Sequence, residues 1–308
     1  MYKILSFDGG GIRGIVTLTL LQRLEQQVPG FVSRADLYAG TSTGGIIALG
    51  LAAGKTIPEL LGLYMQNGAK IFDDSWLKDI VHIGDIIGAK YDQKGLEKIL
   101  TAQFGGTTLA QLNKRVLIPS FDLDYVDPDN PKQHAWSPKF FHNFPGSDTD
   151  GAETVVDVAL DTSAAPTYFP AHDGFIDGGV LANNPTMAAV AQTQDNRAQI
   201  NPRPDLSDLR VLSIGTGTVL GFVKGDHNDW GLAQWAQPLI NLLLDASMDI
   251  ADYQCRQILR DQYRRLAPVF PPGVNIKMDE WKRANELVAF ANQADLGDIA
   301  AWLGQIGW

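Results

Sequence analysis

The stretch that decides the fold is Asp36–Leu51, with the sequence DLYAGTSTGGIIALGL. It reads as a short apolar strand, a turn with Ser42 at its tip, and a helix of small and aliphatic residues. The turn GTSTG matches the G-x-S-x-G pattern of a nucleophile elbow, which holds a serine in a strained turn between strand and helix. Gly40 and Gly44 are expected there because a Cβ at either position would collide as the chain reverses.

An ordinary helix cap is the alternative interpretation of this turn, since serine and threonine are common N-cap residues. The strand before the turn and the helix after it favour the nucleophile. At the start of that helix, the backbone N–H groups and the helix dipole would stabilise negative charge developing beside Ser42. Gly45 and Ala48 would let the same helix pack closely against a sheet.

The composition restricts the classes of partner. The chain has 308 residues, of which 25 are basic and 35 acidic, giving a net charge of −10. This balance argues against a nucleic-acid-binding protein, which needs a basic stripe. Overall charge also gives no attraction to anionic lipid, so any membrane contact is expected to be local and apolar.

The sequence has no recognisable targeting signal, which predicts a cytoplasmic location. Met1 to Lys3 lead directly into an expected strand without the apolar segment of a secretory signal, and no apolar run approaches the ~20 residues that span a bilayer. Cys255 is the single cysteine, which excludes an internal disulfide and fits a reducing compartment. We therefore expect a cytoplasmic protein, peripheral where it contacts a membrane, of undetermined oligomeric state.

Strands and helices alternate along the chain, which predicts a parallel sheet with right-handed crossovers in one α/β domain. The strands are expected at Lys3–Phe7, Asp36–Ala39, Arg115–Phe121, Pro138–Asn143, Gly174–Asp177 and Leu209–Ile214. The helices are expected at Ile15–Val28, Glu59–Asn67, Gln93–Gln103, Thr154–Leu160, Leu232–Leu266, Glu280–Asn292 and Leu296–Ile306, with one more starting at Asn183–Pro185. Ile71–Lys90 has mixed character, and Asp122–Pro138 reads as a loop or edge connection.

A glycine-rich loop, Asp8–Gly14, follows the first expected strand. Its G-x-G-x-x-G pattern also occurs in dinucleotide sites, which need an acidic residue at the end of the next strand. Asp36 instead begins that strand, so the pattern fails this test. Consecutive glycines suit an oxyanion hole better, because their N–H groups can face the charge without side chains in the way. Arg13 has three open roles: bracing this loop, facing a phosphate headgroup, or lying solvated at the surface.

The serine needs a base, and two residues are candidates. His227 follows in the Ser–acid–His chain order of many hydrolases, although its surroundings read as a polar surface loop. Asp177 ends an expected strand just before two glycines. Because the reference pKa of aspartate is ~3.9, the pocket would have to raise it by desolvation. A plain turn aspartate is the alternative for this position.

Several separated segments, taken together, resemble the patatin-like phospholipases. They are Asp8–Gly14, Gly40–Gly45, Ser163–Pro170, Asp177–Gly179, Ala182–Pro185 and Ser213–Gly217, in that order. The resemblance implies a three-layer α/β/α sandwich with a mainly parallel central sheet. It covers residues 2–217, which predicts a catalytic core over 1–217 and a helical C-terminal extension over 218–308 packed on the same domain.

The resemblance also implies roles for individual residues. Ser42 would be the nucleophile and Asp177 the proton acceptor of a serine–aspartate dyad, in which His227 has no counterpart. The oxyanion donors would be Gly9, Gly10, Gly11 and Thr43, supported by Arg13, Gly14, Gly40, Gly44, Gly178 and Gly179. The implied activity is hydrolysis of lipid acyl esters at a membrane or micelle surface, without metal or cofactor.

Other interpretations stay open at this point. A storage or non-catalytic protein could keep the same fold, the glycine loop could serve a nucleotide-binding oxidoreductase, and the same site could perform transacylation. Candidates for an acyl channel are Tyr64, Met65, Tyr168 and Phe169, although core packing is the more common role of such residues. The acidic run between Asp122 and Asp129 lacks the glycine and closing glutamate of a calcium loop.

Overall fold

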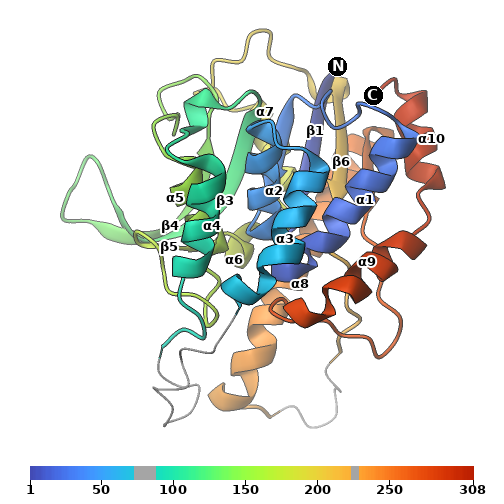
Figure 1. Cartoon of the computed structure of the whole chain (residues 1–308). Coiled ribbons are helices and arrows are strands. Elements are labelled where there is room, and N and C mark those ends of the chain that lie inside the picture. The colour runs from blue at the N-terminus through green and yellow to red at the C-terminus, as the bar shows by residue number, and fades with distance from the viewer. Residues whose placement is uncertain (73–87, 223–228) are drawn as a thin grey trace.

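The computed structural model describes residues 1–72, 88–222 and 229–308 (Figure 1). Within these residues, seven strands form one sheet in the order β4-β3-β2-β1-β6-β7, with β5 also pairing with β3. Every pair from β3 through β7 in this order is parallel, whereas β4 and β5 are antiparallel to β3. The strands are β1 (Tyr2–Phe7), β2 (Leu37–Gly40), β3 (Arg115–Val126), β4 (His134–His142), β5 (Phe175–Asp177), β6 (Leu209–Ile214) and β7 (Tyr263–Leu266).

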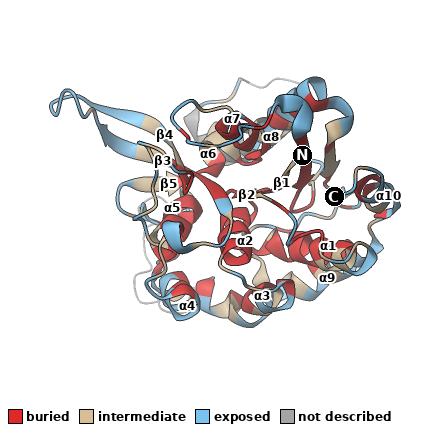
Figure 2. Ribbon diagram, turned by 90° about the horizontal axis from the view of Figure 1, so that it is seen from above, coloured by how far each residue is buried: buried red, intermediate tan, exposed pale blue. Residues whose placement is uncertain are grey.

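Helices cover both faces of this sheet. Seen from above, α1 to α4 and α9 lie along one face, while α7 and α8 lie along the other (Figure 2). The helices are α1 (Gly14–Gln27), α2 (Thr43–Ala52), α3 (Ile57–Ile71), α4 (Lys94–Phe104), α5 (Val155–Ser163), α6 (Gly179–Ala182), α7 (Thr186–Thr193), α8 (Leu232–Leu259), α9 (Ala284–Gln293) and α10 (Gly297–Gln305).

Two hydrophobic cores follow from the alternation of side chains along β1. Leu5 and Phe7 belong to a large core that includes residues of α1 and α2, whereas Ile4 points to a smaller core with Val190 of α7 and Cys255 of α8. Because β1 is buried on both faces, it carries apolar side chains toward both sides of the sheet, although the buried stretch also contains Ser6. The predicted three-layer α/β/α sandwich with a mainly parallel sheet is confirmed.

The register of the central strands brings three turns to one edge of the sheet. Phe7 at the end of β1 pairs with Gly40 of β2 and with Ile214 of β6. The glycine loop, the serine turn and the Gly215–Gly217 turn therefore start side by side. This carboxyl edge is where open α/β sheets bind their ligands.

Some sequence-based expectations were wrong. Tyr263–Leu266 is not the end of a long helix but strand β7, parallel to β6, so the C-terminal region contributes to the sheet. The segment after Phe121, for which a loop or an edge connection was expected, extends β3 and the edge strand β4 into a hairpin that projects from the body (Figures 1 and 2). Pro185 lies at the cap position of α7 rather than inside it, and the Asn184 side chain accepts the Thr186 N–H.

Two expectations lie outside the described residues. They are most of the excursion expected over Ile71–Lys90, and His227 as the alternative base. In the part of the chain that is described, no helix is both long enough and apolar enough to cross a bilayer.

Candidate active site

Ser42 occupies the strained turn that its sequence predicts. Its φ is 55° and its ψ −122°, and α2 starts at the next residue. A Cβ at Gly40 would lie 2.0 Å from the carbonyl oxygen of Gly44, and one at Gly44 would lie 2.2 Å from the carbonyl oxygen of Phe7. Both collisions are with backbone, so neither glycine can be replaced without moving the turn.

We predict that Gly44→Ala destabilises the protein, because the added methyl group must push α2 away from β1. Overpacking of this kind typically costs about 1–3 kcal/mol, which corresponds to a fall of several degrees in Tm. Thermal unfolding followed by circular dichroism measures the effect. Gly304→Ala is the matched control, since a Cβ there meets nothing within 4 Å and the residue is inside helix α10. Equal Tm values for the two variants would contradict the steric argument.

Asp177 ends β5, where antiparallel pairing with Ser120 of β3 fixes its position. The side chain is buried, and its Oδ1 accepts the Gly179 N–H at 2.7 Å. Burial raises the pKa of the carboxyl to about 6, while contact with the Ser42 hydroxyl and the Gly179 N–H opposes this rise. Gly178 is required because a Cβ there would lie 2.2 Å from the Pro119 carbonyl oxygen.

The glycine loop presents only part of what the sequence predicts. The Gly9 N–H donates to the Asn183 carbonyl oxygen at 3.0 Å, so this predicted oxyanion donor already has a protein acceptor. Gly10 and Gly11 line the same cavity as Ser42. Within the described residues, neither of their N–H groups donates to a protein acceptor, so both are available to a ligand.

Thr43 lies at the first position of α2 and also lines the cavity. Its N–H belongs to the first turn of the helix, where backbone donors have no partner within the helix. The Tyr64 hydroxyl donates to the Thr43 carbonyl oxygen at 3.1 Å and fixes this turn. Gly14 leaves room for the threonine, because a Cβ at Gly14 would lie 2.4 Å from Thr43 Oγ1.

One cavity joins these groups. The space between its lining residues, mouth included, is about 850 Å³. Apart from Ser42, Asp177 and the backbone of the two loops, the wall is mainly aliphatic and aromatic. It is lined by Gly10, Gly11, Ser42, Thr43, Ile46, Tyr64, Ile71, Phe72, Leu96, Ser163, Ala165, Pro166, Tyr168, Phe169, Asp177, Val180, Asn183, Leu244 and Met278. Of the four predicted channel residues, Met65 does not line the cavity and is 39% exposed.

Arg13 does not line the cavity. Its side chain is half-buried, which contradicts a freely solvated arginine. Burial lowers the pKa of its guanidinium, and the nearby carboxylates of Asp245 and Asp8 oppose this shift.

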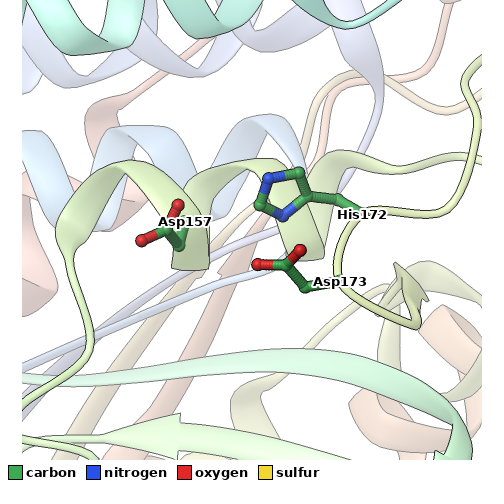
Figure 3. Close-up of side chains that lie close together, drawn as sticks. All are labelled: Asp157, His172 and Asp173. Carbon is green, nitrogen blue, oxygen red and sulfur yellow. The ribbon is translucent and has the colours of Figure 1, made fainter.

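A separate group of possible metal ligands lies on α5 and the loop before β5 (Figure 3). Asp157, His172 and Asp173 each bring one ligand atom within 4.8 Å of the others. His172 Nδ1 is also bonded to Asp161 at 2.7 Å, and this bond raises the pKa of His172. None of the three residues lines the cavity.

Supporting residues that the sequence did not reveal come from distant segments. Thr162 Oγ1 accepts the Ser42 N–H at 3.0 Å, and Asn183 holds Gly9. Thr216 Oγ1 donates to the Gly9 carbonyl oxygen at 2.9 Å. Asn183 and Thr216 lie in segments that carry the resemblance, but no local pattern indicates which atoms they contact.

Asp36 accepts the Lys3 N–H at the opposite end of the sheet, away from the loop that a ribose-binding carboxylate would face.

Fold and cavity together define an α/β protein with a strained serine turn above an apolar pocket. More specifically, the chain belongs to the patatin-like phospholipase family, whose model matches residues 5–190. It is 36% identical over 270 residues to a cGAMP-activated phospholipase of Pseudomonas aeruginosa, covering 85% of this chain and 77% of that protein. It is 33% identical over 307 residues to patatin-like protein 2 of Arabidopsis thaliana, covering 84% and 72%. Among solved structures, VipD of Legionella pneumophila matches at a TM-score of 0.42 and 14% identity, over 94% of this chain and 66% of VipD.

Proposed function

We propose that the protein is a lipid acyl hydrolase that cleaves carboxylic esters through an acyl-enzyme. The observation that carries the proposal is that Ser42, Asp177, Gly10 and Gly11 line one largely apolar cavity, and that within the described residues the N–H groups of both glycines donate to no protein acceptor. An apolar cavity suits an acyl chain, and family membership supports lipid as the substrate class.

In the first step, Asp177 accepts the proton of Ser42 as Ser42 Oγ attacks the ester carbonyl carbon. Asp177 Oδ1 already holds the Gly179 N–H, which leaves the second carboxylate oxygen for this proton. Negative charge develops on the former carbonyl oxygen and is stabilised by the free N–H groups of Gly10, Gly11 and Thr43. The C–O bond of the ester then breaks, and the leaving alcohol takes the proton from Asp177.

The second step releases the fatty acid. Water attacks the carbonyl carbon of the acyl-serine and gives its proton to Asp177, and the same N–H groups again stabilise the oxyanion. When the bond to Ser42 breaks, Asp177 returns the proton to Ser42 Oγ. The burial that raises the pKa of Asp177 makes it a stronger base than a solvated aspartate, and no further protein group is needed for proton transfer.

The substrate class is tested by profiling the products formed from phospholipids, lysophospholipids, galactolipids and simple esters. Wild type is compared with Ser42→Ala, and a fluorophosphonate ester probe reports the reactive serine independently of substrate choice. An alcohol acceptor added to the assay detects transacylation as a new ester. A wild type that the probe fails to label and that turns over no lipid would favour a storage role for the fold.

The assays should include cGAMP, because one relative is named a cGAMP-activated phospholipase. If this chain shares that control, the wild type is inactive until the cyclic dinucleotide is added. Turnover that is the same with and without cGAMP would show an enzyme free of this control.

We predict that kcat/KM falls as the pH drops below about 6. Only ionised Asp177 can accept the serine proton, and burial raises its pKa to about 6. Activity should therefore be lost about tenfold per pH unit on the acid side, with a single titration and a plateau above. The measurement is kcat/KM for a soluble ester between about pH 4 and about pH 8. An inflection near the ordinary aspartate value would contradict the role of burial.

A further inference from the structure

A buried ion pair anchors the start of the glycine loop. Arg265 of β7 donates to both carboxylate oxygens of Asp8, with Nη2–Oδ2 at 2.6 Å and Nη1–Oδ1 at 3.1 Å. The side chain of Asp8 is 1% exposed and that of Arg265 10%. A planar guanidinium held by two bonds fixes both the position and the orientation of the carboxylate.

The same arginine ties the pair to the sheet. Its Nη1 also donates to Ser213 Oγ of β6 at 2.8 Å, and the Asp8 N–H donates to the Ile214 carbonyl oxygen at 3.1 Å. Asp8 is therefore held at its side chain by β7 and at its backbone by β6. The next residue, Gly9, is the first glycine of the loop.

A second contact reaches the loop from the same C-terminal region. The Ile12 N–H donates to the Met278 carbonyl oxygen at 2.8 Å. Gly11 packs against that carbonyl, because a Cβ at Gly11 would lie 2.4 Å from its oxygen. Gly10 and Gly11, which line the cavity, thus lie between an anchor at Asp8 and an anchor at Ile12, and both anchors depend on residues beyond the 5–190 that match the family model.

We propose that Arg265 is a positioning residue of the active site, which acts through Asp8 to direct the Gly10 and Gly11 N–H groups at the developing oxyanion. This inference rests on the proposed function. It makes the region after residue 217 part of the catalytic machinery, although the sequence indicates only a helical extension there.

The physical reason is that an oxyanion hole works only when its donors are fixed before the reaction. Loss of a single donor typically lowers kcat by about 10²–10³-fold. Without Arg265, the Asp8 side chain loses both hydrogen bonds that hold it, and the loop can shift. Lysine at position 265 restores the charge but not the two parallel bonds.

The test compares Arg265→Met and Arg265→Lys with wild type on a soluble ester, measuring kcat and KM separately. We expect kcat to fall about 100-fold for the methionine variant and about 10-fold for the lysine variant, with KM within about twofold, because the N–H groups bind the transition state more strongly than the ester. Arg264→Lys is the matched control. Arg264 is the neighbour on β7, but it lies over the Trp302 ring at 5.5 Å and does not contact the loop, so kcat should be unchanged.

A pair of inhibitors separates positioning from general damage to the fold. A trifluoromethyl ketone becomes a tetrahedral oxyanion on Ser42, whereas the matching ether only fills the acyl cavity. For each variant, the inhibition constant of the ketone should rise by the same factor as kcat/KM falls, while that of the ether stays constant. If Arg265→Met does not fold, Arg265→Lys decides by the same measurement.

Three results decide between the possibilities. The inference would be overturned if kcat were unchanged in Arg265→Lys and Arg265→Met, or if the inhibition constants of the ketone and the ether rose by the same factor. A wild type that neither hydrolyses esters nor reacts with the fluorophosphonate probe would overturn the proposed function itself. If the wild type is active, Ser42→Ala is inactive and the Arg265 variants keep the kcat of wild type, only the positioning role is overturned.

Discussion

Replacing Ser42 with alanine is expected to lower kcat by at least about 10⁴-fold, because removal of the nucleophile leaves only the oxyanion donors and substrate binding. The strained turn at φ 55° places Ser42 in the wall of the cavity, next to Asp177. The measurement is kcat for the best ester found in the substrate profile. The fluorophosphonate probe should label wild type and fail to label the variant.

The fold should survive this substitution, since alanine needs no more space than serine and leaves the Ser42 N–H bond to Thr162 in place. Ser6→Ala is a matched control: Ser6 is also buried, on strand β1, and within the described residues its hydroxyl has no hydrogen-bond partner. Activity of the control should equal that of wild type. Hydrolysis that persists in Ser42→Ala would place the nucleophile elsewhere.

The serine turn was predictable from the sequence because its constraint is local. A strand, a strained residue and a helix within about ten positions leave glycine as the only residue that fits on either side. The structure agrees, because a Cβ added at Gly40 or at Gly44 would collide with the backbone. The parallel order of β1, β2 and β6 was predictable for a similar reason, since apolar runs alternate with helices of ordinary length.

Strand β7 was not predictable, because its four residues follow a long helix and carry two arginines that suit a solvated helix equally well. Its partner β6 supplies the deciding contacts from elsewhere in the chain. The pair of Asp8 and Arg265 spans 257 positions, so no local pattern reveals it. Which glycine N–H is free also depends on a distant residue, since Asn183 occupies that of Gly9.

Asp177→Asn is expected to lower kcat by about 10²–10⁴-fold while making the protein more stable at neutral pH. Asparagine cannot accept the serine proton, so the loss is that of a general base. The gain arises because burial raises the carboxyl pKa from 3.8 to about 6, so that keeping Asp177 ionised in the fold costs on the order of 3 kcal/mol. The neutral amide avoids this cost and still accepts the Gly179 N–H. Kinetics and thermal unfolding on the same preparation measure both effects.

The pH dependence of stability has a definite sign. Below the unfolded pKa of 3.8, Asp177 is protonated in both states and the two proteins should be equally stable. The advantage of Asp177→Asn should build up as the pH rises from about 3.8 to about 6 and stay constant above it. Asp161→Asn is the matched control for activity, since its carboxylate pairs with His172 and lies outside the cavity, so activity should remain. If Asp177→Asn were fully active and His227→Ala inactive, the dyad assignment would be wrong and a triad containing His227 would take its place.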